Sequence, residues 1–176
     1  NEIVNEKKIF QPGEILDRLN DGVIQALHQD SRAQDDGMDV SVCLFNKGSV
    51  TFAGANHSLY VVCNNMLEEI KGDIHSIGSA FGPKGAFKNK NEFTFSEKTF
   101  SPAKGTTIFL TSDGFADQRG GENGRNYSTQ RMKLLMANVG LLKSTIQKEK
   151  IETDFTEWKR EYAQLDDVLV IGIKIS

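Results

Sequence analysis

Two apolar runs of this chain carry aspartates at their ends, and aspartates in such positions can bind a metal ion. Asp113 ends the run 106–112, which is predicted to be a buried strand. Asp166 and Asp167 begin the run 168–175, which has the valine and isoleucine content of a strand. If the two strands pair side by side, Asp113 and Asp166 come within reach of one divalent cation, because hard cations prefer carboxylate oxygens.

Both patterns also have a purely structural interpretation. An aspartate followed by Gly114 after a strand is ordinary turn chemistry, and a pair of aspartates before a strand can simply end a loop. The two patterns alone leave both interpretations open, so the order of the other segments has to decide between them.

The elements that must position these acids are predicted from the spacing of apolar residues. A helix begins at Pro12, and two further helices carry apolar stripes over residues 132–139 and 151–162. Short strands separated by turns between residues 40 and 70 are expected to form an antiparallel meander. Another strand is expected over residues 93–100, and the glycine-rich run 114–126 is expected to be a loop.

Two polar segments offer further ligand groups. The acidic stretch 29–39 can hold a metal, although a solvated loop is the simpler interpretation. The stretch 77–91 combines glycines with lysines, so it is either a loop that attracts a phosphorylated substrate or a solvated surface loop.

Composition excludes several classes of function. The 176 residues carry a net charge of −3 and a pI near 5.7, which argues against nucleic-acid binding because phosphate contacts need a basic surface. No apolar run approaches the length of a membrane span, and a cytoplasmic location is expected. Cys43 and Cys63 lie inside strand-like runs, so neither a disulfide framework nor a thiolate metal site is indicated. The first residue is Asn1 rather than Met, which suggests a piece of a longer chain.

Several short motifs occur in an order that is specific to one family. They are Met38-Asp39-Val-Ser, Phe52-Ala-Gly-Ala-Asn-His57, Ile77-Gly78, Leu110-Thr-Ser-Asp-Gly-Phe-Ala-Asp117 and Asp166-Asp167-Val-Leu-Val. Taken together, they resemble the stage II sporulation E type of PPM phosphatase, a bacterial branch of the metal-dependent type-2C serine/threonine phosphatases. The resemblance runs over nearly the whole chain.

The resemblance implies an α+β fold, an α-β-β-α sandwich of two antiparallel sheets flanked by helices. Residues 1–176 would then be a single PPM-type phosphatase domain that lacks its N-terminal portion, roughly its first quarter. At least one strand of the core sheet would be absent, so a sheet edge would be open and a homodimer is expected to cover it.

The resemblance also implies a site with two Mn²⁺ or Mg²⁺ ions. Asp113 matches the family's Thr/Ser-Asp-Gly metal ligand, with Gly114 in support, and Asp166 matches the first residue of its Asp-Asp or Asp-Asn motif. By similarity Asp167 is a neighbour rather than a direct ligand. The reaction implied is direct hydrolysis of phosphoserine or phosphothreonine by a water that two metal ions activate.

A loop near the site is implied by the same resemblance. Asn56 and His57 fall on the family's Ala-Gly-His-Asn loop, and Ser58 and Leu59 replace the prolines that usually follow it. His57 is the best candidate among the histidines for a proton donor near the leaving group. Residues that bind the substrate are not identified.

The chain departs from the family pattern in one respect. The family's bridging metal ligand lies in a Gly-Asp segment near the domain start, and neither that segment nor the Asp-Gly-His-Gly-like segment after it occurs here. With Asp113 and Asp166 alone on one metal, this polypeptide is expected to bind metal weakly and to hydrolyse little.

Two functions remain in competition. The first is a phosphatase domain, the output of a bacterial signalling protein, whose substrate in this family is often the phosphorylated antagonist of an anti-sigma factor. The second is a non-catalytic partner-binding module that keeps the sandwich for docking. A haloacid-dehalogenase-like phosphatase is excluded because no Asp-x-Asp nucleophile follows an early strand.

Overall fold

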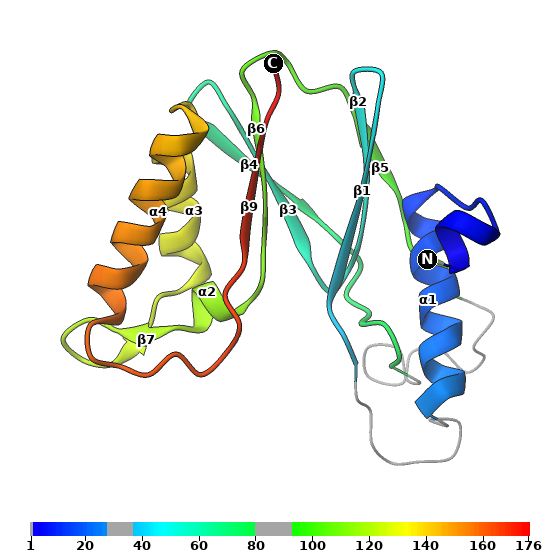
Figure 1. Cartoon of the computed structure of the whole chain (residues 1–176), viewed down its shortest axis with the longest axis horizontal. Coiled ribbons are helices and arrows are strands. Elements are labelled where there is room, and N and C mark those ends of the chain that lie inside the picture. The colour runs from blue at the N-terminus through cyan, green and yellow to red at the C-terminus, as the bar shows by residue number, and fades with distance from the viewer. Residues whose placement is uncertain (1, 28–36, 80–92) are drawn as a thin grey trace. The chain divides into compact units, whose positions relative to one another are not determined.

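A computed structural model of the chain describes residues 2–27, 37–79 and 93–176. These residues form two units, whose helices and strands are drawn in Figure 1. Each unit has its own apolar core. Unit 1 comprises residues 1–59 and 70–102, and unit 2 comprises residues 60–69 and 103–176. The prediction that residues 1–176 form a single phosphatase domain stays a prediction.

Unit 1 packs a helix on a small antiparallel sheet. A π-helical turn, η1 (Glu2–Glu6), precedes the helix α1 (Pro12–Leu27), which begins at the predicted proline. The sheet has the strand order β1-β2-β5, with β1 at Val40–Asn46, β2 at Ser49–Ala55 and β5 at Lys98–Phe100. The core between helix and sheet contains Leu16, Ala53, Ala55, Ile77 and Phe95.

Local chemistry explains the hairpin of unit 1. β1 and β2 pair antiparallel from Val40 opposite Ala55 to Asn46 opposite Ser49. Lys47 and Gly48, which join the strands, both have positive φ, as a two-residue hairpin turn requires. The predicted turn at this position is therefore confirmed.

Unit 2 contains a second antiparallel sheet and two helices that cover one of its faces (Figure 1). The strand order is β4-β3-β6-β9, with β3 at Ser58–Cys63, β4 at Met66–Lys71, β6 at Thr107–Thr111 and β9 at Val170–Lys174. The helices are α3 (Thr129–Val139) and α4 (Ser144–Lys159), and the single-turn helix α2 (Gly114–Asp117) follows β6. The largest buried side chains between sheet and helices are those of Tyr127, Phe109, Phe115 and Met136.

The structure corrects the predicted meander. β2 pairs with β1 and β5, whereas β3 lies beside β4 and β6 in the other sheet. The end of β2 instead approaches the residue after β4, because Gly54 and Gly72 lie so close that a Cβ on Gly72 would be 2.4 Å from the Gly54 carbonyl oxygen. Ala55 consequently forms a parallel bridge with Asp73 instead of starting a hairpin with β3.

Several element boundaries were also predicted wrongly. The strand expected over residues 93–100 is confined to Lys98–Phe100, and the last strand begins only at Val170. The glycine-rich run 114–126 was predicted to be a loop, yet it contains α2 and the paired strands β7 (Arg119–Gly120) and β8 (Arg125–Asn126). Trp158 orders this run, because its indole Nε1 donates to the Gln118 carbonyl oxygen (3.0 Å).

Some predictions lie outside the described residues. Most of the acidic stretch 29–39 and most of the lysine-containing stretch 77–91 belong to this part of the chain. Cys43 and Cys63 are both free thiols, as predicted. Among the helices of the described residues, none has both the length and the apolar character needed to span a membrane.

Candidate functional site

Asp113 stands where the buried strand β6 ends. Thr107, Ile108 and Phe109 of β6 are buried, and so are Gly114 and Phe115 directly after Asp113, yet Asp113 itself is exposed. Asp113 occupies the N-cap position of α2, but its side chain makes no capping hydrogen bond. The Asp117 N–H donates to the Asp113 carbonyl oxygen (3.0 Å), so the backbone of Asp113 takes part in a turn, while its carboxylate makes no capping hydrogen bond.

β9 brings the second acidic segment to the same corner of unit 2. The two strands pair antiparallel from Thr107 opposite Lys174 to Thr111 opposite Val170, so the predicted side-by-side pairing is confirmed. Since the strands run in opposite directions, the end of β6 and the residues before β9 meet at one edge. Asp113 and Asp166 both lie at this edge.

Ser112 ties the acidic segment to β6, and the sequence analysis did not identify it. Its backbone N–H donates to the Leu169 carbonyl oxygen (2.9 Å), and its Oγ donates to the Asp167 carbonyl oxygen (2.8 Å). The Leu169 N–H in turn donates to Ser112 Oγ (2.8 Å). The only sequence signal was its position directly before Asp113, and it acts by positioning the segment 166–169.

Gly114 allows the closest approach between the two acidic segments. A Cβ on Gly114 would lie 2.5 Å from the Asp167 carbonyl oxygen and 3.2 Å from the Asp166 Cβ. The φ of Gly114 is not in the left-handed region, so this close packing, rather than the backbone conformation, requires glycine. The backbone of Asp166 and Asp167 is thereby fixed against the residue that follows Asp113.

The Asp166–Asp167 pair is held by a local hydrogen bond and is otherwise exposed. The Asp167 N–H donates to Asp166 Oδ1 (2.7 Å), and the Gln164 side-chain amide donates to the Asp166 carbonyl oxygen (3.0 Å). Within residues 2–27, 37–79 and 93–176, no ion pair involves Asp113, Asp166 or Asp167. Three carboxylates without a cationic partner at one edge attract a cation.

The donors fit Mg²⁺ or Mn²⁺ in chemistry but are few. In the part of the chain that the structure describes, no group of three or more His, Cys, Asp or Glu residues could hold a metal ion. Proteins commonly hold Mg²⁺ with one or two carboxylates, waters completing its coordination. Asp113 and Asp166 are donors of this chemical type.

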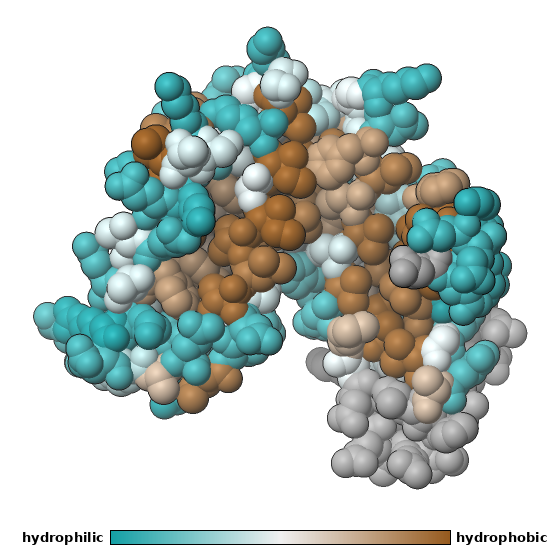
Figure 2. All heavy atoms as spheres, viewed as in Figure 1, coloured by the Kyte–Doolittle hydropathy of each residue, from teal (hydrophilic) through white to brown (hydrophobic). Residues whose placement is uncertain are grey.

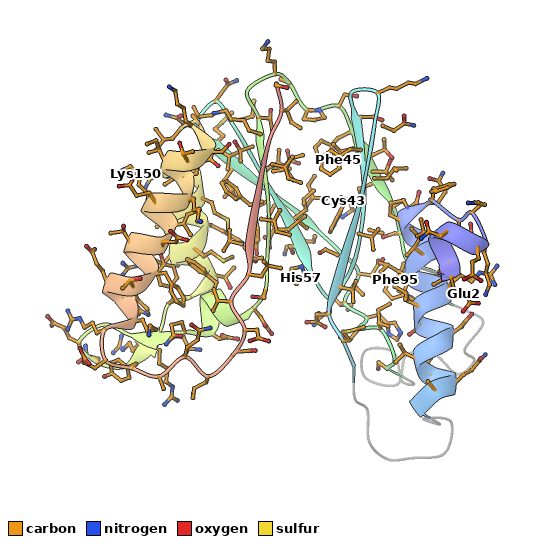
Figure 3. All side chains as sticks on the ribbon, in the orientation of Figure 1. Glu2, Cys43, Phe45, His57, Phe95 and Lys150 are labelled. Carbon is orange, nitrogen blue, oxygen red and sulfur yellow. The ribbon has the colours of Figure 1, made fainter. Side chains whose placement is uncertain are left out.

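The predicted loop residues Asn56 and His57 belong to unit 1. The Ser41 Oγ lies 2.7 Å from His57 Nδ1, and the half-buried imidazole is labelled in Figure 3. The Asn56 amide donates to Asp39 Oδ2 (3.0 Å), and Ser76 Oγ donates to Asp39 Oδ1 (2.6 Å). Ser76 belongs to no recognised motif, so sequence reasoning could not have found it.

The two antiparallel sheets with their helices make this an α+β fold. The family model for stage II sporulation protein E (SpoIIE) matches residues 3–176. The chain therefore belongs to the SpoIIE family of PPM-type phosphatase domains. A search of curated protein sequences found no significant match.

Solved structures show the same fold. The SiaA-PP2C domain of Pseudomonas aeruginosa has 21% identity and a TM-score of 0.68, with 92% of this chain and 69% of that chain covered. The phosphatase domain of the cell fate determinant SpoIIE from Bacillus subtilis has 16% identity and a TM-score of 0.52, with 92% and 72% covered. The catalytic domain of the serine/threonine phosphatase PstP, in complex with 2 manganese ions, has 12% identity and a TM-score of 0.56, with 89% and 67% covered.

Proposed function

We propose that this chain is a metal-dependent protein serine/threonine phosphatase domain that hydrolyses phosphoserine and phosphothreonine with water as the nucleophile. The observation that carries the proposal is the meeting of Asp113 and Asp166 at one edge of unit 2, supported by the β6–β9 register and by Gly114. Asp113 and Asp166 would hold Mn²⁺ or Mg²⁺. The manganese ions in the PstP structure support this choice of metal, and two ions are expected in a complete domain.

The residues of the chain have separate roles in this proposal. A bound ion would supply an activated water and would offset the charge on the phosphoryl oxygens. Asp113 and Asp166 provide the ligand oxygens, and Ser112 positions the segment that carries Asp166. The Asp167 N–H bond to Asp166 Oδ1 fixes the orientation of that carboxylate, so Asp167 acts through its backbone.

On the family resemblance alone, and not on the placement of the two units, His57 is proposed as the proton donor to the leaving serine or threonine oxygen. Ser41 Oγ engages Nδ1 at 2.7 Å and so fixes the ring. Proton donation would then use the second ring nitrogen, Nε2. His57→Gln would lower the rate for alkyl phosphates more than for p-nitrophenyl phosphate, whose leaving group needs no proton.

The biological role proposed is the output of a cytoplasmic bacterial signalling protein. Its substrate would be a phosphorylated protein, such as the antagonist of an anti-sigma factor. Because only two carboxylates are available, the chain is expected to bind metal weakly and to turn over slowly.

Hydrolysis of p-nitrophenyl phosphate over a Mn²⁺ titration tests the proposal. We compare the chain with Asp113→Asn and Asp166→Asn, and we use Asp21→Asn, an exposed aspartate of α1, as the matched control. A slow Mn²⁺-dependent rate that both site variants lose and the control keeps is the expected result. A rate that is the same in Asp113→Asn as in the unaltered chain would refute the assignment.

A second candidate function is a partner-binding module without catalysis. It is favoured by the small number of metal donors among the described residues. The same titration separates the two, because such a module would show neither hydrolysis nor metal binding.

A further inference from the structure

Gln118 is a buried amide that connects the two acidic segments of the candidate site. It is 4% exposed and occupies the C-cap position of α2, whose N-cap is Asp113. Its Nε2 donates to the Arg119 carbonyl oxygen (2.8 Å) and to the Ala163 carbonyl oxygen (3.1 Å). Because Ala163 comes shortly before Asp166 in the sequence, the second bond joins α2 to the segment that carries Asp166.

The backbone of Gln118 is itself held in place. Its carbonyl oxygen accepts from the Tyr127 N–H (2.8 Å) and from Trp158 Nε1 (3.0 Å). The Trp158 carbonyl oxygen in turn accepts from the Gly121 N–H (2.8 Å). Since these bonds already order the backbone, the Gln118 amide loses little further conformational freedom when it bonds to Ala163. The side chain is therefore a stiff link rather than a mobile one.

The β7–β8 hairpin after Gln118 has no apolar side chains of its own with which to pack. Residues 119–126 have the sequence RGGENGRN, and Figure 2 shows hydrophilic surface at the end of unit 2 where β7 lies. Gly120 lies directly on Trp158, and a Cβ at this position would be 2.0 Å from the Trp158 carbonyl oxygen. The attachment of the hairpin to α4 therefore depends on Trp158 and on the hydrogen bonds around Gln118.

Asp166 lies between two anchors that belong to one short stretch of chain. The first anchor is the bond from Gln118 to the Ala163 carbonyl oxygen. The second is formed by Ser112, whose Oγ exchanges hydrogen bonds with residues just after Asp166. Ser112 and Gln118 flank the single-turn helix α2, so this helix sets the separation of the anchors. Residues 164–166 between the anchors are exposed, so loss of one anchor lets Asp166 move.

The end of α4 makes the first anchor necessary. Arg160 ends this helix with φ 49° and ψ −129°, a backbone conformation that favours glycine. Residues in such conformations persist only where their surroundings hold them. The chain after Arg160 is held by Gln118 at Ala163 and by Tyr162, whose hydroxyl oxygen would lie 2.9 Å from a Cβ on Gly124 of the hairpin. Without the Gln118 amide, this turn is free to relax.

We infer that Gln118 is a positioning residue for the Asp113–Asp166 site. Its amide fixes Asp166 relative to Asp113 from the N-terminal side of Asp166, as Ser112 does from the C-terminal side. Removal of its two N–H donors leaves the fold in place but weakens the binding of a divalent cation. The consequence for metal binding rests on the proposed function, whereas the ordering of residues 161–169 does not.

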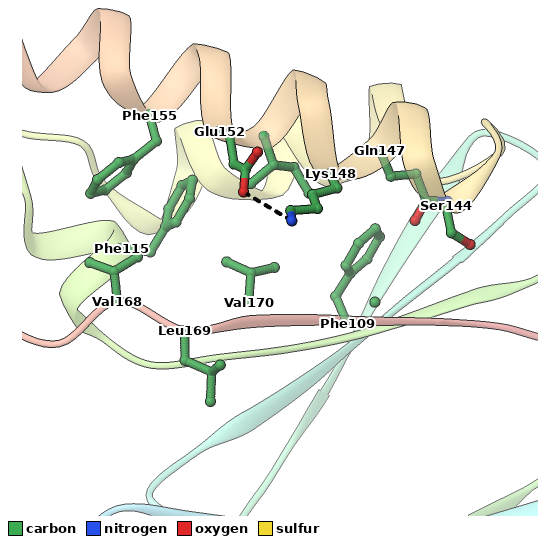
Figure 4. A pocket seen from close by; sticks show the side chains of 12 residues that line it. Phe109, Phe115, Ser144, Gln147, Lys148, Glu152, Phe155, Val168, Leu169 and Val170 are labelled. Atoms are coloured by element: carbon green, nitrogen blue, oxygen red, sulfur yellow. Dashed lines mark ion pairs between the residues drawn. The ribbon is translucent and has the colours of Figure 1, made fainter.

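Gln147 provides a matched control within the same unit. It is 3% exposed, and its Nε2 donates to the carbonyl oxygens of Gly140 (2.9 Å) and Leu142 (3.1 Å). It lies beside Ser144 in the first turn of α4, where it lines a groove between α4 and β9 (Figure 4). Gln118→Met and Gln147→Met each remove a buried amide of the same size, so similar losses of stability are expected, but only Gln118 bonds to the segment that carries Asp166.

Amide hydrogen exchange without added metal tests the positioning, with peptides that cover residues 161–169 followed by mass spectrometry. These peptides should exchange faster in Gln118→Met than in the unaltered chain or in Gln147→Met, because the opening is local to this segment. Equal exchange of these peptides in the two variants would overturn the inference. If Gln118→Met does not fold, Gln118→Asn takes its place, since it keeps an amide but shortens its reach, with Gln147→Asn as its control.

Calorimetric titration with Mn²⁺ tests the consequence for the site. Loss of a group that orients a metal ligand commonly lowers metal affinity by about 10–100-fold, so Gln118→Met should bind Mn²⁺ at least about tenfold more weakly than the unaltered chain. Gln147→Met should bind Mn²⁺ as the unaltered chain does. Equal affinity in both variants, when the unaltered chain binds Mn²⁺, would overturn the inference alone. Absence of Mn²⁺ binding in the unaltered chain would instead refute the proposed function and, with it, a role of Gln118 at a metal site.

Discussion

Gly114→Ala should disturb the edge that carries both aspartates while leaving the fold in place. The added Cβ would lie 2.5 Å from the Asp167 carbonyl oxygen, whereas ordinary contacts begin near 3.4 Å. The segment that carries Asp166 therefore has to move by about 1 Å, a displacement that can cost a site about 100-fold in activity.

The effect on stability is expected to be modest. Overpacking in a rigid region costs about 1–3 kcal/mol. Alanine in place of glycine in the first turn of α2 recovers up to about 1 kcal/mol. The net loss in the free energy of unfolding is then about 0–3 kcal/mol.

Urea denaturation and Mn²⁺ titration by calorimetry measure the two effects separately. The matched control is Gly22→Ala inside α1, where an added Cβ meets no atom within 4 Å. That control should stabilise the chain by about 0.5–1 kcal/mol and leave Mn²⁺ binding unchanged. If Gly114→Ala were as stable as Gly22→Ala and bound Mn²⁺ like the unaltered chain, the close-packing argument would be refuted.

Three further predictions concern stability and reactivity. Burial raises the pKa of Asp17, and the hydrogen bond from the Phe95 N–H offsets part of this rise, so the stability that this carboxyl contributes is largest at low pH and falls as the pH rises through its folded pKa. Urea denaturation at several pH values should therefore show that Asp17→Asn gains stability relative to the unaltered chain towards neutral pH. A relative loss would contradict this prediction. Burial raises the pKa of the Cys43 thiol to about 11, so its alkylation by iodoacetamide at pH 8 should be slow until the chain unfolds. Rapid labelling of Cys43 in the folded chain, measured by mass spectrometry, would contradict this prediction. The buried Gln147 amide donates to the Gly140 carbonyl oxygen (2.9 Å), so Gln147→Met should lower the free energy of unfolding by about 1–3 kcal/mol. An unchanged free energy of unfolding would show that water replaces the hydrogen bond to Gly140.

The pairing of the two acidic strands could be predicted because its signals are local. The apolar run of β6 ends at Asp113, and Asp166 precedes a second run, so each aspartate is placed by its own neighbours in the sequence. Antiparallel pairing of the two runs then brings the aspartates to one edge. The hydrogen bonds of Ser112 across this edge depend on residues far along the chain and could not be read from its own neighbours.

The partners of the other strands could not be predicted for a similar reason. The spacing of residues 40–70 indicates strands and turns, but two strands joined by a short turn need not pair. Whether β3 pairs with β2 depends on the meeting of Gly54 with Gly72, which lie far apart in the sequence. In the same way, the glycine-rich run 114–126 acquires regular structure because Trp158 of α4 packs on Gly120.

The most direct test of the account is whether Asp113 and Asp166 hold the same ion. Calorimetric titration with Mn²⁺ is carried out on the unaltered chain, Asp113→Asn, Asp166→Asn, the double variant and the control Asp21→Asn. The account predicts weaker Mn²⁺ binding in Asp113→Asn and in Asp166→Asn, and unchanged binding in the control. The loss of binding free energy in the double variant should differ from the sum of the two single losses by at least about 0.5 kcal/mol, as for groups that share one ligand. Mn²⁺ affinity that is the same with and without the Asp113 and Asp166 carboxylates would contradict it.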